Sequence, residues 1–486
     1  MARFFCLYNM RLFFSEHRTL FFQDAIVFLC CFITSNAVAQ SIPEQQSEKI
    51  VVAGKQYSRS SLHERLWGRH YRKEWATPVK VSILYLDSLH GGLSPYKSGG
   101  GTQSNTLRLR NAAGKEYVLR SVDKTFGRAL PEIYRGSFIE RLIDDQVSIG
   151  HPYAALTIPT MAEAAKINHT LPVIGFFPHQ DALGEYNDQY GNDLYLLEQR
   201  PDENWEEAEN FDNAEKIIGT EKLLKQLEKD NDNTVDQLAF VRSRLFDLLI
   251  GDWSRHEDQW RWAKLKMSDV RIYTAIPRDR DQTYTLFDGF LLKLALSGAG
   301  LGHLQSFDHW IKDIERYTFP SRNIDRRLLN ELTREEWLSV AKELQVLMTD
   351  EIIETAVKKL PPEVYPISGA KITAKLKSRR DLLHKYAEDY YRFLAKEVDV
   401  NGSMKKEFFH VIRLADGNTH LKIYKINKDV ERLAAPFYSR LFKPAETKEI
   451  RLYGLSGADN YLVEGNVPKA IDLRIVGGVD QDSIIV

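Results

Sequence analysis

The chain has 486 residues, of which 43% are hydrophobic, 27% charged and 11% aromatic. This composition excludes disordered, collagen-like and disulfide-scaffold proteins. The 66 basic and 67 acidic residues give a net charge of −1, so we expect no general attraction to nucleic acid or to an anionic membrane. Any nucleotide must then be bound by a local site.

Residues 1–39 have the pattern of a secretory signal peptide. Arg11 and Arg18 precede a short apolar run at 25–33, and residues 37–39, Ala-Val-Ala, form a small-x-small cleavage site. The apolar run is too short to span a bilayer; the alternative is a buried N-terminal helix. No later segment reads as a transmembrane helix. The sequence therefore predicts an exported protein, located in the periplasm or cell envelope.

All three cysteines, Cys6, Cys30 and Cys31, lie inside this leader. The mature chain would contain no cysteine. Disulfides, thiolate metal sites and a cysteine nucleophile are therefore excluded after cleavage.

Residues 40–200 are predicted to form a β-rich lobe. The segments 79–84, 106–110 and 116–120 have strand-like patterns, and Asn-Ala-Ala-Gly at 111–114 predicts a hairpin between the last two. Within the same lobe we expect one helix over 134–151, with its inner face formed by Phe138, Leu142 and Val147.

Residues 201–400 are predicted to be mainly helical. Apolar residues recur at helical spacing over 235–250, and Gly251 can end that helix. Thr333 and Glu336 form a capping box at the start of another helix. A longer helix is expected over 372–394.

Residues 401–486 return to a strand pattern and contain an internal repeat, because the motif from Ile450 recurs from Leu473. The segment 477–484 approximates the glycine–aspartate turn of calcium-binding β-rolls, which predicts Ca²⁺ at this repeat. The alternative is an exposed turn in a small sheet. Since the second copy runs to the last residue, a truncated longer array is a further alternative.

The segment 248–262 places many titratable residues in a loop between a buried helix and a hairpin predicted over 259–266 and 270–276. The hairpin leads to Asp279 and Asp281. In an extended chain both carboxylates would point to one face, where they repel unless a cation lies between them. Such oxygen ligands suit Mg²⁺ or Mn²⁺; the alternative is a surface network of aspartates and neighbouring arginines.

The motif Leu-Ile-Gly-Asp-Trp-Ser-Arg-His-Glu-Asp-Gln at 249–259, followed by Ile-Pro-Arg-Asp-Arg-Asp-Gln-Thr-Tyr at 276–284, resembles a group of atypical kinases. That group includes spore-coat CotH kinases, secretory-pathway Golgi kinases and HipA toxin kinases. Over residues 95–400 the resemblance implies an α+β fold with a two-lobed, protein-kinase-like core and a helical C-terminal lobe. A small β-rich module would follow, with a β-solenoid as one form of it.

The resemblance also assigns roles to residues of the loop and the hairpin end. Gln259 takes the position of a metal-binding amide, and Asp279 or Asp281 that of a metal-binding carboxylate. His256 would be a scaffold residue of the loop. Bound ATP with Mg²⁺ or Mn²⁺ is implied.

Further roles follow upstream. The glycines at 99–101 would form a phosphate-covering loop, or else a flexible turn. Arg120 takes the place of the strand lysine that grips phosphates, with Lys124 as a nearby substitute. Glu140 on the following helix would pair with that cation, and the strand ending at Glu198 would lead to an adenine-contacting hinge.

Two departures from the family pattern matter. Ser254 stands where the family has its catalytic aspartate, and a hydroxyl cannot accept a proton at neutral pH as a carboxylate can. Asp252 is the best available base. Arg120 also presents its charge to phosphate differently from a lysine.

The region from 67–71 onward further resembles the middle segment of large bacterial envelope proteins, but it contains neither a phosphoesterase metal signature nor a Gly-x-Ser-x-Gly elbow. Two hypotheses remain. The first is an exported, metal- and ATP-dependent phosphotransferase acting on an unknown protein or small-molecule acceptor. The second is a degenerate envelope module, a pseudokinase whose β-repeat mediates binding or assembly.

Overall fold

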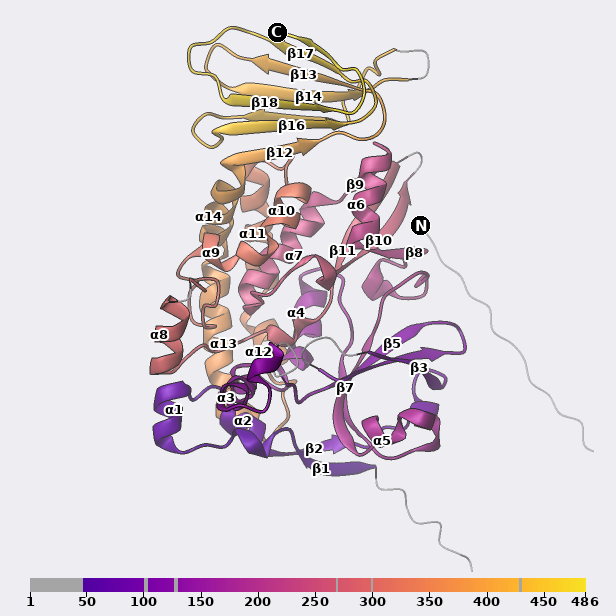
Figure 1. Ribbon diagram of the computed structural model, residues 1–486, viewed down its shortest axis with the longest axis vertical. Helices are drawn as coiled ribbons and strands as arrows, with labels where there is room; N and C mark the ends of the chain where they lie inside the picture. The colour runs from indigo at the N-terminus through magenta and orange to yellow at the C-terminus, as the bar shows by residue number, and fades with distance from the viewer. Residues whose placement is uncertain (1–46, 100–103, 126–129, 268–269, 299, 428–430) are drawn as a thin grey trace, which may run out of the picture. The chain divides into compact units, whose positions relative to one another are not determined.

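Five antiparallel strands form the sheet of the first lobe, in the order β3-β4-β5-β7-β6 (Figure 1). The computed structural model describes residues 47–99, 104–125, 130–267, 270–298, 300–427 and 431–486. The strands of this sheet are β3 (Leu93–Gly99), β4 (Thr106–Asn111), β5 (Glu116–Ser121), β6 (Val173–Phe177) and β7 (Asp193–Gln199). The predicted hairpin between β4 and β5 is confirmed; Gly114 supplies its positive φ of 78°.

The two faces of this sheet have different chemistry. Leu107, Leu119 and Leu197 lie opposite one another on neighbouring strands and are buried in an apolar core. Because side chains alternate along a strand, Arg120 and Glu198 emerge on the other face. The alternation in the sequence therefore directs charged groups toward the second lobe.

Short helices and an antiparallel strand pair surround this sheet. They are β1 (Glu48–Val52), β2 (Pro78–Ser82), α1 (Ser61–Trp67), α2 (Arg72–Ala76), α3 (Phe138–Asp145), α4 (Ile158–Ala164) and α5 (Asn187–Tyr190). The helix predicted over 134–151 is shorter than expected. Its proposed inner residue Phe138 is 66% exposed, because α3 turns its first residues to solvent.

A second sheet holds the hairpin that was predicted from the sequence. Its strands are β8 (Lys216–Gly219), β9 (Asn233–Val235), β10 (Trp260–Met267) and β11 (Val270–Pro277), in the order β8-β10-β11-β9. β10 and β11 pair along their whole length, with Trp260 opposite Pro277. The end of β11 is thereby fixed beside the start of β10.

Helices build the rest of the second lobe. They are α6 (Thr220–Lys229), α7 (Gln237–Ile250), α8 (Phe290–Gly298), α9 (Ile314–Tyr317), α10 (Arg322–Leu328), α11 (Arg334–Leu347), α12 (Asp350–Val357), α13 (Tyr365–Asp381) and α14 (Leu383–Ala395). The capping box of Thr333 and Glu336 is confirmed. The long helix expected over 372–394 is instead divided at Leu382. Residues Gln46–Val486 form one compact unit.

The C-terminal module consists of two sheets, ordered β12-β16-β18 and β15-β14-β13-β17-β19, and no solenoid is seen among its described residues. The strands are β12 (Glu397–Asn401), β13 (Glu407–Arg413), β14 (Thr419–Lys425), β15 (Tyr438–Phe442), β16 (Glu449–Leu455), β17 (Asn460–Glu464), β18 (Asp472–Gly478) and β19 (Ser483–Ile485). With the helical and β lobes described above, they confirm the α+β class.

The internal repeat places equivalent strands side by side. β16 pairs in parallel with β18, and β17 with β19, so that Ile450 lies opposite Leu473. β12 and β13 extend the same parallel ladders, a third layer that sequence similarity did not reveal. The two sequence repeats are therefore two successive layers of the same sheets.

The acidic residues of the repeat accept hydrogen bonds from the backbone. Asp482 accepts the N–H of Asp459 at 2.8 Å, and Asp480 accepts the N–H of Gly457 at 2.7 Å. Among the described residues, no group of three or more histidine, cysteine or acidic side chains is placed to hold a metal ion. The geometry therefore gives no support to the predicted Ca²⁺ site.

Asp459 predicts a pH dependence for this module. Burial, together with the charges of Glu407, Asp482 and Asp480, raises the pKa of Asp459 from 3.8 to about 8. A folded-state pKa above the unfolded value stabilises the fold at low pH, and this contribution is lost as the pH rises toward about 8. We expect amide exchange of residues 449–464 to be faster in the wild type than in Asp459→Asn above that pH, and similar below pH ~5. Asp472→Asn, an exposed carboxylate on β18, should behave as the wild type; equal exchange in all three proteins at high pH would contradict the assignment.

No helix of the described residues is long and apolar enough to cross a membrane. The predicted signal peptide at 1–39 lies outside the described residues.

Candidate functional site

The loop of the sequence motif is anchored by the helix that precedes it. Asp236 caps the start of α7 by accepting the N–H of Ala239 at 2.8 Å. Gly251 ends the helix in the left-handed conformation, with a φ of 77°. Residues 252–259 then run from this buried helix to β10, which leaves them between the two lobes.

A pocket of about 650 Å³ opens beside this loop. Five of the predicted site residues line it: Arg120, Lys124, Gln259, Asp279 and Asp281. Ser254 and His256 line it as well, and Trp253, Phe287 and His303 form an aromatic wall. Residues from both lobes thus meet in one cavity.

Charges of opposite sign pair across the pocket. Arg120 on β5 forms an ion pair with Asp279, and Nζ of Lys124 lies 2.5 Å from a carboxylate oxygen of Asp281. Burial alone would raise the pKa of Asp281, but the charges of Lys124 and Arg120 outweigh it and hold the pKa below its usual value. The charges of Lys124 and Arg120 therefore favour the ionised form of Asp281.

Asp279 and Asp281 reach the pocket by a tight turn. The backbone N–H of Arg278 donates to the carbonyl of Gln259 at 2.9 Å; Asp279 then adopts a φ of 57°, and a single helical turn follows at Arg280–Gln282. The extended Asp-x-Asp segment assumed from the sequence is therefore wrong. The turn nevertheless brings both carboxylates to the same pocket.

Gln259 is oriented by its own loop. Its amide oxygen accepts the N–H of His256 at 3.3 Å, and its amide nitrogen lies 3.5 Å from the hydroxyl of Ser254. The backbone hydrogen bond from Arg278 places this amide next to the turn that carries Asp279. An amide and a carboxylate are thereby brought to the same side of the pocket.

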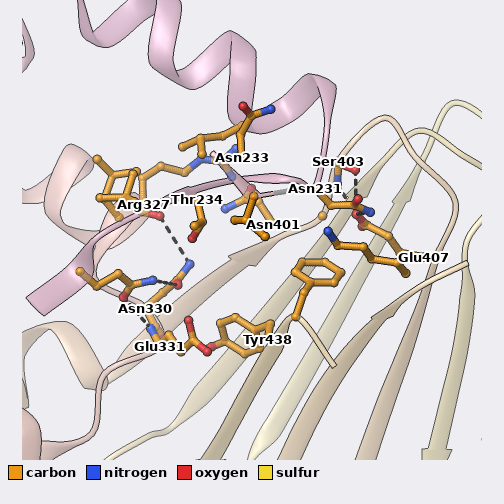
Figure 2. Close-up of a pocket in the computed structure, with 18 residues that line it drawn as sticks. Asn231, Asn233, Thr234, Arg327, Asn330, Glu331, Asn401, Ser403, Glu407 and Tyr438 are labelled. Atoms are coloured by element: carbon orange, nitrogen blue, oxygen red, sulfur yellow. Dashed lines mark hydrogen bonds between the residues drawn. The ribbon is translucent and has the colours of Figure 1, made fainter. Parts of the chain in front are cut away.

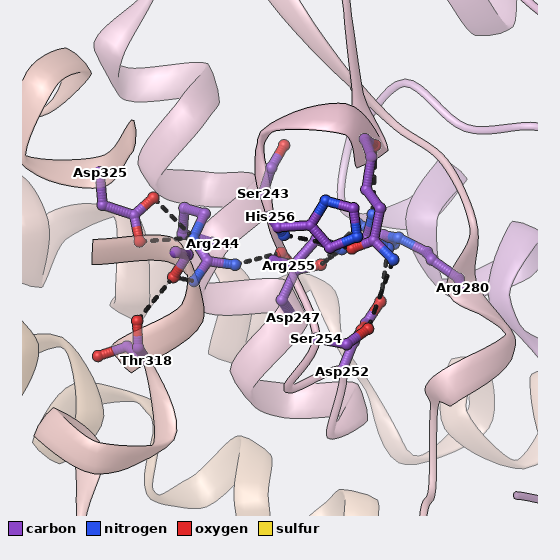
Figure 3. Close-up of polar contacts among 12 residues, drawn as sticks. Ser243, Arg244, Asp247, Asp252, Ser254, Arg255, His256, Arg280, Thr318 and Asp325 are labelled. Atoms are coloured by element: carbon purple, nitrogen blue, oxygen red, sulfur yellow. Dashed lines mark hydrogen bonds and ion pairs between the residues drawn. The ribbon is translucent and has the colours of Figure 1, made fainter. Parts of the chain in front are cut away.

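Asp252, the predicted base, is not among the residues that line the pocket. It is only 2% exposed and forms an ion pair of 2.5 Å with Arg255 (Figure 3). Burial raises the pKa of Asp252, although the charge of Arg255 lowers it. Its carboxylate supports the loop from behind and cannot reach a substrate in the pocket.

The ion pair of Asp252 belongs to a buried network centred on Asp247 of α7. Asp247 pairs with Arg244 at 2.6 Å, with Arg280 at 3.0 Å and with Arg255 at 3.6 Å. Burial lowers the pKa of Arg280 to about 10, although Asp247 opposes this shift. The network ties α7, the loop and the Asp279 turn together, as Figure 3 shows.

The partner expected for Arg120 is also different. The carboxylate of Glu140 accepts the backbone N–H of Gly136 at the start of α3, and no ion pair links it to Arg120 or Lys124. Glu198 lies 3.6 Å from Arg120 instead. Burial raises the pKa of Glu198, and the charge of Arg120 opposes that shift. The adjacent strand, rather than the helix, therefore supplies the carboxylate.

The predicted phosphate-covering loop at 99–101 lies largely outside the described residues, since only Gly99 at the end of β3 is described.

Sequence reasoning missed several arginines near Arg120. Burial lowers the pKa of Arg278, and the positive charges of Arg261, Arg120 and Arg200 lower it further. Arg261 lies near the start of the predicted hairpin, and Arg278 directly follows its last strand. The hairpin pattern was therefore the sequence signal that could have found both residues. That these ends face the sheet of the first lobe could not be read from the hairpin alone.

A second pocket, of about 300 Å³, lies between the second lobe and the C-terminal sheets (Figure 2). Its polar groups are mostly engaged in the fold. Glu407 accepts hydrogen bonds from Ser403 at 2.7 Å and from Asn231 at 2.8 Å, and Asn330 donates to the carbonyl of Asp399 at 2.9 Å. None of the predicted site residues lines this pocket. Because its polar groups bond to one another and to the backbone, we interpret it as the packing junction between the second lobe and the C-terminal sheets.

The residues of the first pocket fit a metal–nucleotide complex. Mg²⁺ is usually held by one or two carboxylates together with substrate phosphates, and Asp279, Asp281 and the amide of Gln259 provide such a set. Arg120 and Lys124 offer hydrogen-bond donors and positive charge to phosphate oxygens. Arg120 is paired with Asp279 and Lys124 with Asp281. A metal ion bound to the two carboxylates and a phosphate bound to the two cations can therefore replace both ion pairs together.

No family model and no curated protein matches the sequence. Among solved structures, the chain is similar to the Helicobacter pylori proinflammatory kinase CtkA, at 14% identity and a TM-score of 0.32 over 61% of this chain and 94% of that one. It is also similar to the amicoumacin kinase hAmiN, in complex with AMP-PNP, Ca²⁺ and Ami, at 11% identity and a TM-score of 0.13 over 60% and 87% of the two chains. Structural similarity at these TM-scores does not support a functional assignment. The function is therefore assigned from the residues of this chain.

Proposed function

We propose that this protein is a metal-dependent phosphotransferase of kinase-like fold, with ATP as the expected donor. One observation carries the proposal: Arg120 and Lys124 of the first lobe face Asp279 and Asp281 of the second in a single pocket. Phosphoryl transfer depends on positioning and on neutralising phosphate charge, and both cations and metal ligands are used for this. The pocket contains both kinds of group.

The order of these groups along the chain supports the same proposal. In protein kinases, a lysine on the third strand contacts the phosphates, and a catalytic-loop amide and a later aspartate hold the metal. Here Arg120 lies on β5, the third strand of its sheet along the chain. Gln259 ends the loop after α7, and Asp279 follows the hairpin.

Each residue has a distinct role in this proposal. Arg120 and Lys124 bind and orient phosphate oxygens, and Asp279, Asp281 and Gln259 hold Mg²⁺ or Mn²⁺. When bound, the metal ion neutralises charge on the phosphate that is transferred. The aromatic wall of Trp253 and Phe287 excludes water from one side of the pocket.

The acceptor is activated weakly in this arrangement. Ser254 lines the pocket where a carboxylate base would be expected, and Asp252 is buried behind it. His256 is exposed and lines the same pocket. Positioning and charge neutralisation remain available in this pocket, but the contribution of a positioned base is missing, so we expect slow transfer.

This proposal predicts ADP formation from ATP that requires Mg²⁺ or Mn²⁺. Ser254→Asp should increase its rate by about 100-fold, since a positioned base contributes roughly 10²–10⁴. Ser254→Ala, the matched control, should leave the rate nearly unchanged. ADP release should be measured in a coupled assay with an EDTA control. Absence of metal-dependent ADP formation in both the wild type and Ser254→Asp would contradict the proposed activity.

The second candidate is a non-catalytic envelope module. The burial of Asp252 and the serine at 254 favour it, as do the apolar side chains on the outer strands: Val476 is 44% exposed and Ile485 61% exposed. Binding of a partner without any effect of nucleotide would distinguish this candidate. The signal-peptide pattern at 1–39 supports export to the periplasm or envelope in both proposals.

A further inference from the structure

Five arginines converge on the face of the first sheet that carries Arg120. Besides Arg120, they are Arg108 on β4, Arg200 after β7, Arg261 on β10 and Arg278 after β11. Arg108 lies opposite Val118, which in turn lies opposite Glu198. Because opposite residues share a face, Arg108 emerges on the same face as Glu198, with Val118 between them, and this face also carries Arg120. We call these five residues the arginine cluster.

The second lobe contributes its two members from the hairpin. Arg261 lies opposite Ile276, and Arg278 follows two residues later, so both side chains belong to the same side of the hairpin. Arg278 donates to the backbone carbonyl of Asp258 at 3.0 Å. Arg120 pairs with Asp279, the residue that follows Arg278, so the first sheet and the end of the hairpin meet here. The positive charges of Arg261, Arg120 and Arg200 also lower the pKa of Arg278, in addition to burial.

Carboxylates neutralise only part of the cluster. Arg200 pairs with Glu116 and Asp202, and Arg120 pairs with Glu198 and Asp279. Arg108, Arg261 and Arg278 form no ion pair with any described residue. Glu198 and Asp258 act on them only at longer range.

Several guanidinium nitrogens of the cluster are also without partners. The Nε–H groups of Arg120, Arg261 and Arg278 are buried and donate no hydrogen bond to any described residue, although Nε of Arg120 lies 3.6 Å from Glu198. A buried donor without an acceptor costs about 1–3 kcal/mol, and arginine does not lose its proton in proteins. Three arginines without an ion pair, two of them with an unpartnered buried Nε, therefore favour an anion with several oxygens.

We infer that the arginine cluster binds a phosphate group of the substrate, next to the pocket that holds Asp279 and Asp281. Planar guanidinium groups bind phosphate oxygens in bidentate fashion, and Arg120 lies in both the cluster and the pocket. The inference rests on the proposed function, because it extends the same site. The arginine cluster extends the proposed function in one respect: recognition of the substrate depends on an additional phosphate, beyond the phosphates held with the metal ion.

Inorganic tripolyphosphate without metal is the direct probe of the cluster. It should raise the melting temperature of the wild-type protein by several degrees, and the double variant Arg261→Gln/Arg278→Gln should lose most of this shift. Arg242→Gln, which removes an arginine of α7 outside the cluster, should keep it. Adenosine alone should give no shift. An equal tripolyphosphate shift in the double variant, or none in the wild type, would overturn the inference.

A second arm identifies the source of the phosphate. If the tripolyphosphate shift persists at saturating Mg²⁺–ATP, the cluster takes the phosphate of a second substrate; if ATP abolishes it, the cluster takes phosphates of the nucleotide itself. Should the double variant still show metal-dependent ATP binding while the tripolyphosphate shift is unchanged, the cluster inference fails and the proposed function stands. Absence of metal-dependent ATP binding in the wild type would instead reject the proposed function. A circular dichroism spectrum of the double variant confirms that it is folded.

Discussion

Asp279→Asn should weaken metal-dependent ATP binding by at least about 100-fold, since even the outer partners of metal ligands contribute about 10- to 100-fold. The carboxylate of Asp279 faces the pocket and pairs with Arg120. Asparagine has nearly the same shape but removes the charge that a divalent cation requires. Titration calorimetry with ATP and Mg²⁺ measures the change.

The same variant should behave differently without metal. Removing the charge of Asp279 releases Arg120 from its ion pair, so ATP binding in EDTA should be equal to that of the wild type or tighter. Asp258→Asn is the matched control, because Asp258 is exposed on the loop that ends at Gln259 and does not line the pocket. Equal losses with and without metal would show that Asp279 acts on the fold rather than on a metal ion.

Asp247→Ala should lower the free energy of unfolding by about 3–5 kcal/mol, the usual cost of leaving a buried charge without its partner. Asp247 is fully buried and pairs with Arg244, Arg255 and Arg280. Its loss leaves these guanidinium groups with less compensation in a region that excludes water. Urea unfolding followed by tryptophan fluorescence measures the effect.

The control for this prediction is an ion pair between α7 and α11. Arg242 of α7 pairs with Glu343, whose side chain is 53% exposed. Glu343→Gln should change the free energy of unfolding by less than about 1 kcal/mol, because exposed ion pairs contribute little. Similar effects of the two variants would contradict the buried-network account.

Local patterns predicted the parts of the site that lie close together in the sequence. Asp279 and Asp281 were predicted because a buried helix, a polar loop and a hairpin follow one another within a short stretch, and the family resemblance of that stretch implied Gln259. The hairpin register then brings Gln259 beside Arg278. Arg120 was found from its place on a strand, and the structure confirms that strand.

Features that depend on burial or on packing between lobes could not be predicted. Asp252 and Ser254 are two residues apart in one loop, yet Asp252 is buried against Arg255 while Ser254 lines the pocket. Glu140 was predicted as the partner of Arg120, and Glu198 as the end of a hinge strand, because the register of β5 with β7 was not known. The arginine cluster combines residues from both lobes, so no single segment indicated it.

The central claim is that one pocket binds a nucleoside triphosphate with a divalent metal ion. A thermal-shift titration with ATP, with and without Mg²⁺ or Mn²⁺, tests it most directly, beside the Asp281→Asn variant. We predict a metal-dependent stabilisation of roughly 2.7 kcal/mol at about a hundred times the dissociation constant, which the variant loses. No stabilisation by any metal–nucleotide combination, or an equal one in Asp281→Asn, would contradict the account.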